Sequence, residues 1–431
     1  MRKLSNLIRF VMPRLGHPIV PGTFRANFLH LYLDIAWFAI TAATAMSFVG
    51  VFITRQGASV FQLGLLSAGS GVVNLLISTS AGRWLERRPL EKSVLQTAIL
   101  NRLTYVPWVV LPFFLLPGQQ VWSILGLTVL ASIPGAALNM GFNALFAEAV
   151  PMEWRGHVAG RRNALYAIIF ILVTLLAGWI LKTLPFPLGY QVIFALAVLG
   201  ATMSTVHLGL IRLRRPEAPV LEPEITMASV DAEAAILVEP APKRRSGLRP
   251  EVLRGAFGKV LVALMIFHLS LFLPSPLFSL YMVNDLGLTD PQISFGTALF
   301  YVAMLGGSLS LDRMVRRWGN QKVTAIGALF ISCYPLVMAL GKSVWGFMAA
   351  SPFGGLGWAL AGGAMINWLL ERVSPADRAV SLVWYNLAIN AAMLFGSLLG
   401  SAGGDWMGVR VALLVFGGLR MLAALYILKR G

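Results

Sequence analysis

We consider first five side chains inside apolar stretches of this 431-residue sequence that can carry a charge or a proton. Asp34 is the one acidic residue of eighteen that lies well inside such a stretch, and His30 precedes it by about one helical turn. Arg102, His268 and Arg420 lie inside three other stretches. A charge at membrane depth costs about 2.5 to 3.5 kcal/mol on insertion scales, so such residues are normally paired, hydrated or functional. Asp34, His30, Arg102 and His268 are therefore our candidates for proton coupling.

The role of Asp34 has two open interpretations. Its carboxyl group could carry a proton, or it could form a structural ion pair with Arg102. The ion pair is possible because each residue lies about the same number of residues from the expected cytoplasmic end of its stretch. His268 precedes the helix-breaking segment 274–276 (Pro-Ser-Pro), and it could titrate near neutral pH or donate one hydrogen bond. Arg420 is expected to reach the membrane surface or to pair with an acid.

A second set of residues could bind a solute. Trp37 and Thr41 follow Asp34 at three- and four-residue steps, so these side chains share one face of a helix. Two pairs of asparagines recur at helical spacing elsewhere, and such amides could bind a solute or join neighbouring helices. A tryptophan lies in the glycine-rich run 354–363, which would let a helix bend. The candidate cavity residues are Trp37, Thr41, Asn139, Asn143, Trp358, Asn386 and Asn390.

Twelve apolar stretches must position these residues, and each is long enough to cross about 30 Å of hydrocarbon as a helix. The chain is 57% hydrophobic and only 12% charged, so most of it requires lipid as its solvent. The predicted spans are residues 27–53, 60–82, 94–116, 121–147, 164–184, 189–211, 257–282, 292–312, 322–341, 344–370, 379–402 and 408–428. This pattern predicts an all-α membrane protein.

The distribution of basic residues predicts the topology. Twenty-nine of the 35 Lys and Arg residues fall in alternate gaps between the stretches, and only four fall in the other gaps. Basic loops stay on the cytoplasmic side, so we expect a multi-pass protein of the plasma or inner membrane with both termini cytoplasmic. The net charge of +17 is then explained by topology and attraction to anionic lipid, and no nucleic acid partner is expected.

The sequence divides into four predicted regions. Residues 1–26 form a basic, proline-containing arm, which we expect to be cytoplasmic and retained. Residues 27–212 and 256–431 each contain six apolar stretches. Residues 213–255 hold six prolines and separate acidic and basic clusters, which predicts a disordered cytoplasmic linker because little apolar area can be buried there.

The two halves of the sequence repeat each other. An offset of 230 residues places Gly57, Gln62, Arg83, Arg87 and Lys92 opposite Gly287, Gln292, Arg313, Arg317 and Lys322. An offset of 223 residues places Glu148, Val150, Arg155 and Asn163 opposite Glu371, Val373, Arg378 and Asn386. Duplicated membrane bundles typically hold a substrate site between their halves near the midplane.

The repeated loops resemble the Major Facilitator Superfamily, whose loop between helices two and three reads approximately G-x-x-x-D-R-x-G-R-R. Residues 312–322 (DRMVRRWGNQK) are similar to the second-half copy of this motif, and residues 82–89 (GRWLERRP) to the first-half copy, with Glu86 as its carboxylate. The resemblance implies twelve transmembrane helices in two pseudo-symmetric six-helix bundles. It also implies that helices one, four, seven and ten line a central cavity.

Charged residues at the cytoplasmic loops could form a gate. An acid at a helix end that faces Arg clusters makes charge-assisted hydrogen bonds, which could join the two bundles in one state and release them in the other. Exposed topology charges are the alternative interpretation, because surface ion pairs contribute little. The predicted gate residues are Arg83, Glu86, Arg87, Glu148, Arg155, Asp312, Arg313, Arg317, Glu371 and Arg378.

We therefore expect a secondary active transporter that moves a small amphipathic or hydrophobic solute by alternating access, coupled to protons. The alternatives are an uncoupled facilitator and a non-transporting receptor or lipid-handling protein of the same fold. No cofactor or metal site is expected, since the one cysteine and the scattered histidines offer no ligand spacing and no phosphate-binding loop occurs. The expected partners are the solute, protons and the lipid bilayer. We expect the protein to be a monomer, and we do not expect it to be an enzyme.

Overall fold

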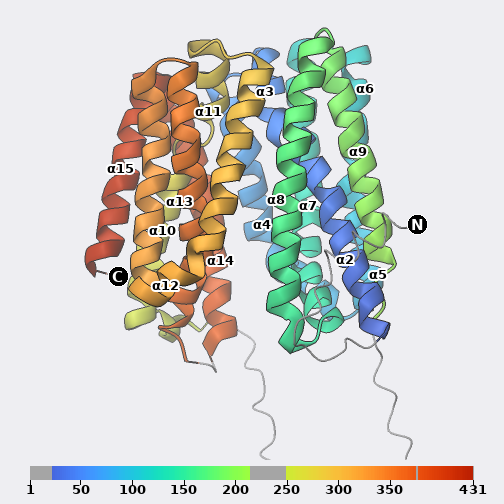
Figure 1. Cartoon of the computed structure of the whole chain (residues 1–431), viewed down its shortest axis with the longest axis vertical. Coiled ribbons are helices and arrows are strands. Elements are labelled where there is room, and N and C mark those ends of the chain that lie inside the picture. Colours follow the sequence, from blue (N-terminus) through green and yellow to red (C-terminus); the bar gives the residue numbers. More distant parts are fainter. Residues whose placement is uncertain (1–21, 214–248, 375–376, 431) are drawn as a thin grey trace, which may run out of the picture.

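The computed structural model describes residues 22–213, 249–374 and 377–430, all of them in helices or short connections (Figure 1). Most of the predicted arm and linker, residues 1–21 and 214–248, lies outside the described residues. Eleven described helices are long and apolar enough to cross a membrane. The longest, α12 (Asp290–Gly341), is interrupted by the non-helical residue Gly319, which divides it into two spans. The predicted all-α fold with twelve spans is confirmed.

The N-terminal half, drawn in blue to green on the right of Figure 1, supplies the first six spans. Its elements are α2 (Gly22–Thr41), the π-helix η1 (Ala42–Met46), α3 (Ser47–Arg55), α4 (Val60–Glu86), α5 (Leu90–Leu103), α6 (Val106–Phe114), α7 (Pro117–Ala149), α8 (Met152–Thr183) and α9 (Leu188–Gly209).

The C-terminal half, drawn in yellow to red, lies beside it and supplies the other six spans. Its elements are the 3-10 helix η2 (Pro250–Leu253), α10 (Ala256–Phe272), α11 (Leu277–Leu280), the π-helix η3 (Tyr281–Asp285), α12, α13 (Val344–Leu370), α14 (Arg378–Met407) and α15 (Val409–Arg430).

The 230-residue repeat includes the residues that form the starts of α4 and α12. The Ser59 side chain accepts from the backbone N–H of Gln62, and the Gln62 side chain accepts from the N–H of Ser59. Thr289 and Gln292 form the same reciprocal capping box. A capping box satisfies two donors that a helix start leaves free. The repeated sequence therefore encodes the same helix start in both halves.

The start of α8 differs from the prediction. The apolar stretch predicted a helix from residue 164, but α8 begins at Met152. Pro151 ends the preceding segment, because the Val150 before it is extended, and Glu153 supplies an acid in the first turn. The additional turns are polar, so hydropathy alone does not detect them.

Two prolines of the C-terminal half remove backbone donors, and Arg420 supplies donors in their place. Pro274 and Pro335 have no N–H, which leaves the carbonyl groups of Ser270 and Ile331 without their usual partners. Arg420 donates to both carbonyl oxygens at 3.2 Å. We predicted that Arg420 reaches the membrane surface or pairs with an acid. This prediction is wrong, because its side chain is 1% exposed and forms no ion pair among the described residues. Arg420 instead joins α15 to α10 and α12.

The two halves meet through small residues. α4 packs against α14, and α8 packs against α12. A methyl group added at Gly64 would lie 1.9 Å from the Ser401 Oγ, and one at Gly178 would lie 2.4 Å from the Ser294 Oγ. Such positions allow helices to approach closely where apolar burial alone gives little driving force.

Gly319 provides a test of the turn that divides α12. Its backbone has φ 78° and ψ 163°, a region that essentially only glycine adopts, and nothing lies near the position of an added Cβ. We expect Gly319→Ala to destabilise the protein by about 1–3 kcal/mol. Gly306→Ala is the matched control, because Gly306 is helical and also has open space around it. Thermal unfolding of the purified chain measures both variants, and equal melting temperatures would contradict the assignment.

Candidate functional site

The only ion pair between the halves within the described residues lies at one end of the molecule. The Arg55 Nη2 lies 2.7 Å from the Asp290 Oδ1, and the Tyr190 hydroxyl donates to the same oxygen at 2.8 Å. Arg55 also donates to the carbonyl oxygen of Leu288 at 3.0 Å. These contacts join α3 and α9 to the first turn of α12. We call Arg55, Asp290 and Tyr190 the Arg55 lock, and their end of the molecule the Arg55 end.

The predicted gate residues lie at the opposite end, which we call the basic end. Among the residues that the structure describes, none of them forms an ion pair with the other half. Arg155 instead donates to the carbonyl oxygen of Val150 at 3.1 Å, and Glu371 accepts from the Asn320 amide at 2.6 Å. These bonds stay within one half. The gate role of Arg83, Glu86, Arg87, Glu148, Arg155, Asp312, Arg313, Arg317, Glu371 and Arg378 therefore stays a prediction.

Aromatic side chains join the halves between α8 and α12. The rings of Phe170 and Tyr301 stack with their centroids 3.7 Å apart, and Tyr166 lies 6.4 Å from Tyr301. Buried Ala42 and Ala43 of the π-helix η1 pack against this group. A π-helix is a local defect in the helical ladder and often marks a functional position.

Asp34 is the centre of a buried ionic cluster. Its carboxylate lies 3.1 Å from the Arg162 Nη2 and 3.8 Å from the Arg102 Nη2, and it accepts a hydrogen bond from Ser204. Arg102 also donates to the Thr205 hydroxyl at 2.7 Å. Asp34 is only 3% exposed. The predicted pairing of Asp34 with Arg102 is present, and the cluster ties α2, α5, α8 and α9 together.

Arg162 was missed by the sequence analysis. It was counted with the loop charges, because the fifth span was expected to begin at residue 164. Arg162 lies ten residues into α8 and is buried, with its guanidinium 4.5 Å from the Phe142 ring. Pro151 and Glu153 form a helix-start signal that could have located it inside the helix.

The predicted cavity face of the first helix packs against α9. Thr41 donates to the Ala197 carbonyl oxygen at 2.9 Å, and the Nδ1 atoms of His30 and His207 lie 3.2 Å apart. A methyl group added at Gly200 would lie 2.7 Å from the Trp37 carbonyl oxygen. The shared face was predicted correctly, but it forms an interface within the N-terminal half. We therefore do not propose Thr41 as a solute contact.

The predicted polar residues of the C-terminal half bond to the backbone of their own helices. The His268 Nδ1 lies 2.7 Å from the Leu264 carbonyl oxygen of its own helix, and its ring meets the Tyr385 ring edge-on. Asn386 and Asn390 donate to carbonyl groups one turn earlier in α14. Trp358 is 47% exposed. Solute binding by Trp358, Asn386 and Asn390 stays a prediction.

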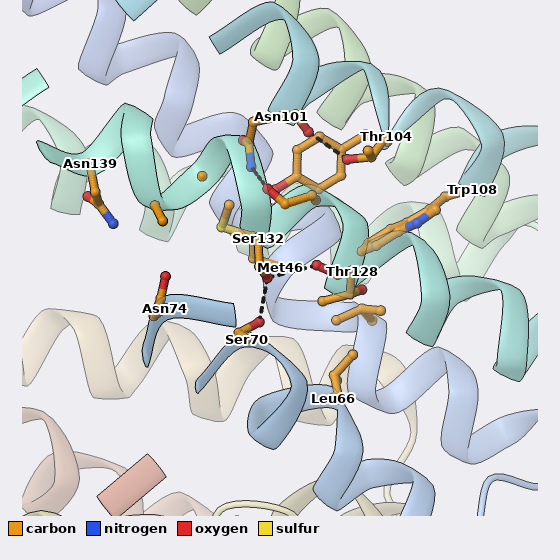
Figure 2. Close-up of a pocket in the computed structure, with 15 residues that line it drawn as sticks. Met46, Leu66, Ser70, Asn74, Asn101, Thr104, Trp108, Thr128, Ser132 and Asn139 are labelled. Carbon is orange, nitrogen blue, oxygen red and sulfur yellow. Dashed lines mark hydrogen bonds between the residues drawn. The ribbon is translucent and has the colours of Figure 1, made fainter. Parts of the chain in front are cut away.

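A polar pocket of about 380 Å³ lies in the N-terminal half, lined by η1, α3, α4, α5, α6 and α7 (Figure 2). Asn139 is the one predicted cavity residue that lines it. The Ser70 and Ser132 hydroxyls hydrogen-bond across it at 2.8 Å, joining α4 to α7. The pocket lining is Met46, Val49, Leu66, Ser70, Asn74, Asn101, Thr104, Tyr105, Trp108, Thr128, Ala131, Ser132, Gly135, Ala136 and Asn139.

The sequence analysis did not identify this pocket. The segment between α5 and α6 breaks at Thr104 and Tyr105, just before Pro107, which removes a backbone donor there. The amide of Asn101 donates instead to the Ala131 carbonyl oxygen of α7 at 2.9 Å. Pro107 was the available signal, because a proline within a spanning helix marks a place where backbone groups need other partners.

The family model of the Major Facilitator Superfamily matches residues 34–259 and 260–430. The chain belongs to this superfamily and is a transmembrane transporter rather than an enzyme. It is 25% identical over 381 residues to an uncharacterized MFS-type transporter of Yersinia pestis, covering 88% of this chain and 87% of the relative. It is 23% identical over 234 residues to a cis,cis-muconate transport protein of Acinetobacter baylyi, covering 52% of this chain and 54% of that protein.

Solved structures share the fold at low identity. A bacterial homologue of the iron transporter ferroportin in the inward-facing state has a TM-score of 0.70 at 15% identity, covering 94% of this chain and 99% of that chain. A D-xylose–proton symporter has a TM-score of 0.67 at 16% identity, covering 94% and 96%. These similarities establish the fold and leave the solute open.

The Asp34 cluster predicts a graded loss of stability. Asp34→Asn leaves two buried guanidinium groups without an acid, and removing one partner of a buried pair costs about 3–5 kcal/mol. Arg162→Met should cost less, because Asp34 keeps Arg102. Arg161→Met is the matched control, since the neighbouring Arg161 forms no ion pair among the described residues. Thermal unfolding of the purified protein should give this order, and wild-type melting of Asp34→Asn would refute it.

Proposed function

We propose that this transporter moves a small amphipathic solute by rocking its two halves about their shared interface. The Arg55 lock supports this proposal most directly. It closes one end of the interface by ionic contacts, while the charges at the basic end have no partner in the other half among the described residues. An arrangement that is joined at one end only is what one state of an alternating-access cycle requires.

The same observation supports an orientation. Basic loops stay on the cytoplasmic side of a membrane, so the basic end would face the cytoplasm and the Arg55 end the outside. The described conformation would then be inward-facing. In the opposite state the predicted gate residues, including Glu86 and Asp312, would pair between the halves after the Arg55 lock has opened.

The names of similar proteins indicate a range of solutes. They include cis,cis-muconate, a dicarboxylate, and D-xylose, an uncharged sugar. Direction of transport follows from neither name. The solute class is therefore argued separately from the chemistry of the pocket.

We also propose that transport is coupled to protons through Asp34. A proton on Asp34 would remove the one negative charge that pairs with Arg102 and Arg162 among the described residues, so the cluster would have to rearrange. That rearrangement would move four helices together. An uncoupled facilitator is the competing function, and the buried position of Asp34 between two arginines favours it.

Proteoliposomes distinguish the two functions. Under proton coupling, an imposed pH gradient drives solute accumulation in the wild type, and Asp34→Asn abolishes accumulation while solute exchange across the membrane continues. Continued exchange shows that the variant is folded. Transport that is unchanged when the gradient is dissipated would instead identify a facilitator.

The Arg55 lock predicts a shift between conformations. Hydrogen bonds to charged groups contribute about 1.5–3 kcal/mol, so Asp290→Asn should change the ratio of the two states by about tenfold or more. Spin labels at Ser80→Cys and Ser308→Cys, in a chain with Cys333→Ser, report the separation of α4 and α12 near the basic end. Asp290→Asn should add a population with a shorter distance.

Asp405→Asn is the matched control for this measurement. Asp405 is an exposed acid at the end of α14, on the same side of the molecule, and it forms no ion pair within the described ranges. It should keep the wild-type distances. An unchanged distribution in Asp290→Asn would remove the lock from the proposed mechanism.

A further inference from the structure

The polar pocket lies inside the N-terminal half rather than between the halves. All fifteen residues that line it come from the first four spans, and Figure 2 shows Ser70 and Asn74 on α4 opposite Ser132 and Asn139 on α7. Its volume of about 380 Å³ is within the 300–1,000 Å³ that small-molecule sites typically occupy. The pocket is therefore large enough for a small organic solute.

Several hydrogen-bonding groups of the pocket are not used by the protein. Within the part of the chain that the structure describes, the side-chain amides of Asn74 and Asn139 bond to no other residue. Asn139 is exposed and Asn74 is half-buried, so a bound molecule can supply partners for both amides.

The pocket lining contains no charged side chain. No Asp, Glu, Lys, Arg or His is among its fifteen residues. A charged solute would enter without a compensating charge and would lose its hydration, which is costly in an apolar protein interior. An uncharged solute with hydroxyl or amide groups would lose little, because the asparagine amides can replace its water. The lining therefore favours neutral ligands.

One side of the pocket is apolar. Met46 and Val49 of the first span and Leu66 of α4 line it, and the Tyr105 and Trp108 rings meet edge to face with their centroids 5.3 Å apart. Such a surface fits the flat or apolar face of a ring. A ligand with polar groups on one side and a ring face on the other would match both parts.

We propose that this pocket is a binding subsite for an uncharged solute of monosaccharide or nucleoside size, formed by the N-terminal half alone. This inference rests on the proposed transport function and specifies its substrate class. Asn74 and Asn139 hydrogen-bond the polar groups of the solute, and Met46 and Leu66 contact its apolar face.

Thiol labelling tests the pocket directly, because Cys333 is the only cysteine in the sequence. The variant Ser132→Cys is made in the full chain with Cys333→Ser, which places one thiol in the pocket. The probes are methyl methanethiosulfonate, which is uncharged, and its anionic 2-sulfonatoethyl and cationic 2-trimethylammonioethyl analogues. Asn143→Cys, an exposed position one turn beyond Asn139, is the accessible control, and Ser332→Cys, which is fully buried outside the pocket, is the inaccessible one.

We expect the uncharged reagent to modify Ser132→Cys, and both charged reagents to react at least tenfold more slowly there, after normalisation to Asn143→Cys. Uridine or D-xylose at millimolar concentration should slow the labelling of Ser132→Cys, and cis,cis-muconate should not. Asn74→Leu should remove that protection without changing the labelling of Asn143→Cys.

Three outcomes would overturn the proposal. The first is that the thiol of Ser132→Cys is as unreactive as that of Ser332→Cys. The second is that the charged reagents modify Ser132→Cys as fast as the uncharged reagent does. The third is that muconate slows the labelling of Ser132→Cys, or that neither uridine nor D-xylose slows it. None of these outcomes would affect the spin-label distances at Ser80 and Ser308, so a failure of the subsite remains separate from a failure of the rocking mechanism.

Discussion

Asp34 holds four helices of the N-terminal half together because its carboxylate is buried and the other three helices supply its partners. Its carboxylate faces Arg162 at 3.1 Å and Arg102 at 3.8 Å, and these arginines come from α8 and α5. Removing a buried partner leaves the remaining charges uncompensated, so the three residues are interdependent. The cluster is connected to the pocket through α5, which also carries Asn101, and to the inter-half contact through α8, which also carries Phe170.

The C-terminal half also contains a buried charged side chain, but this side chain has partners of a different kind. Arg420 forms no ion pair within the described part of the chain and instead donates to carbonyl groups that Pro274 and Pro335 leave free. The halves are therefore similar in backbone, as the equivalent capping boxes at Ser59 and Thr289 illustrate. They differ in the side chains that stabilise them. The functional groups can consequently be concentrated in one half, where the buried acid and the polar pocket both lie.

Movement between the halves depends on contacts that can separate. The Arg55 lock is small and lies at one end, and the other close approaches involve glycines such as Gly64 and Gly178. Small residues pack well without interlocking, so two rigid units can rotate across them. In the proposed cycle, the ionic cluster keeps the N-terminal half rigid, and the Arg55 lock decides which end is closed. Rigid halves with a weakly joined interface are what the proposed cycle requires.

Composition, hydropathy and loop charge determined the all-α membrane fold, the twelve spans and the internal repeat, because each is a property of local sequence in an apolar solvent. Periodicity also determined that His30, Asp34 and Thr41 share a face. Only the tertiary structure decided that this face meets α9, that Arg162 completes the cluster, and that a pocket forms beside Asn139. A helical period specifies which residues point the same way, but the neighbour they meet depends on how distant helices pack.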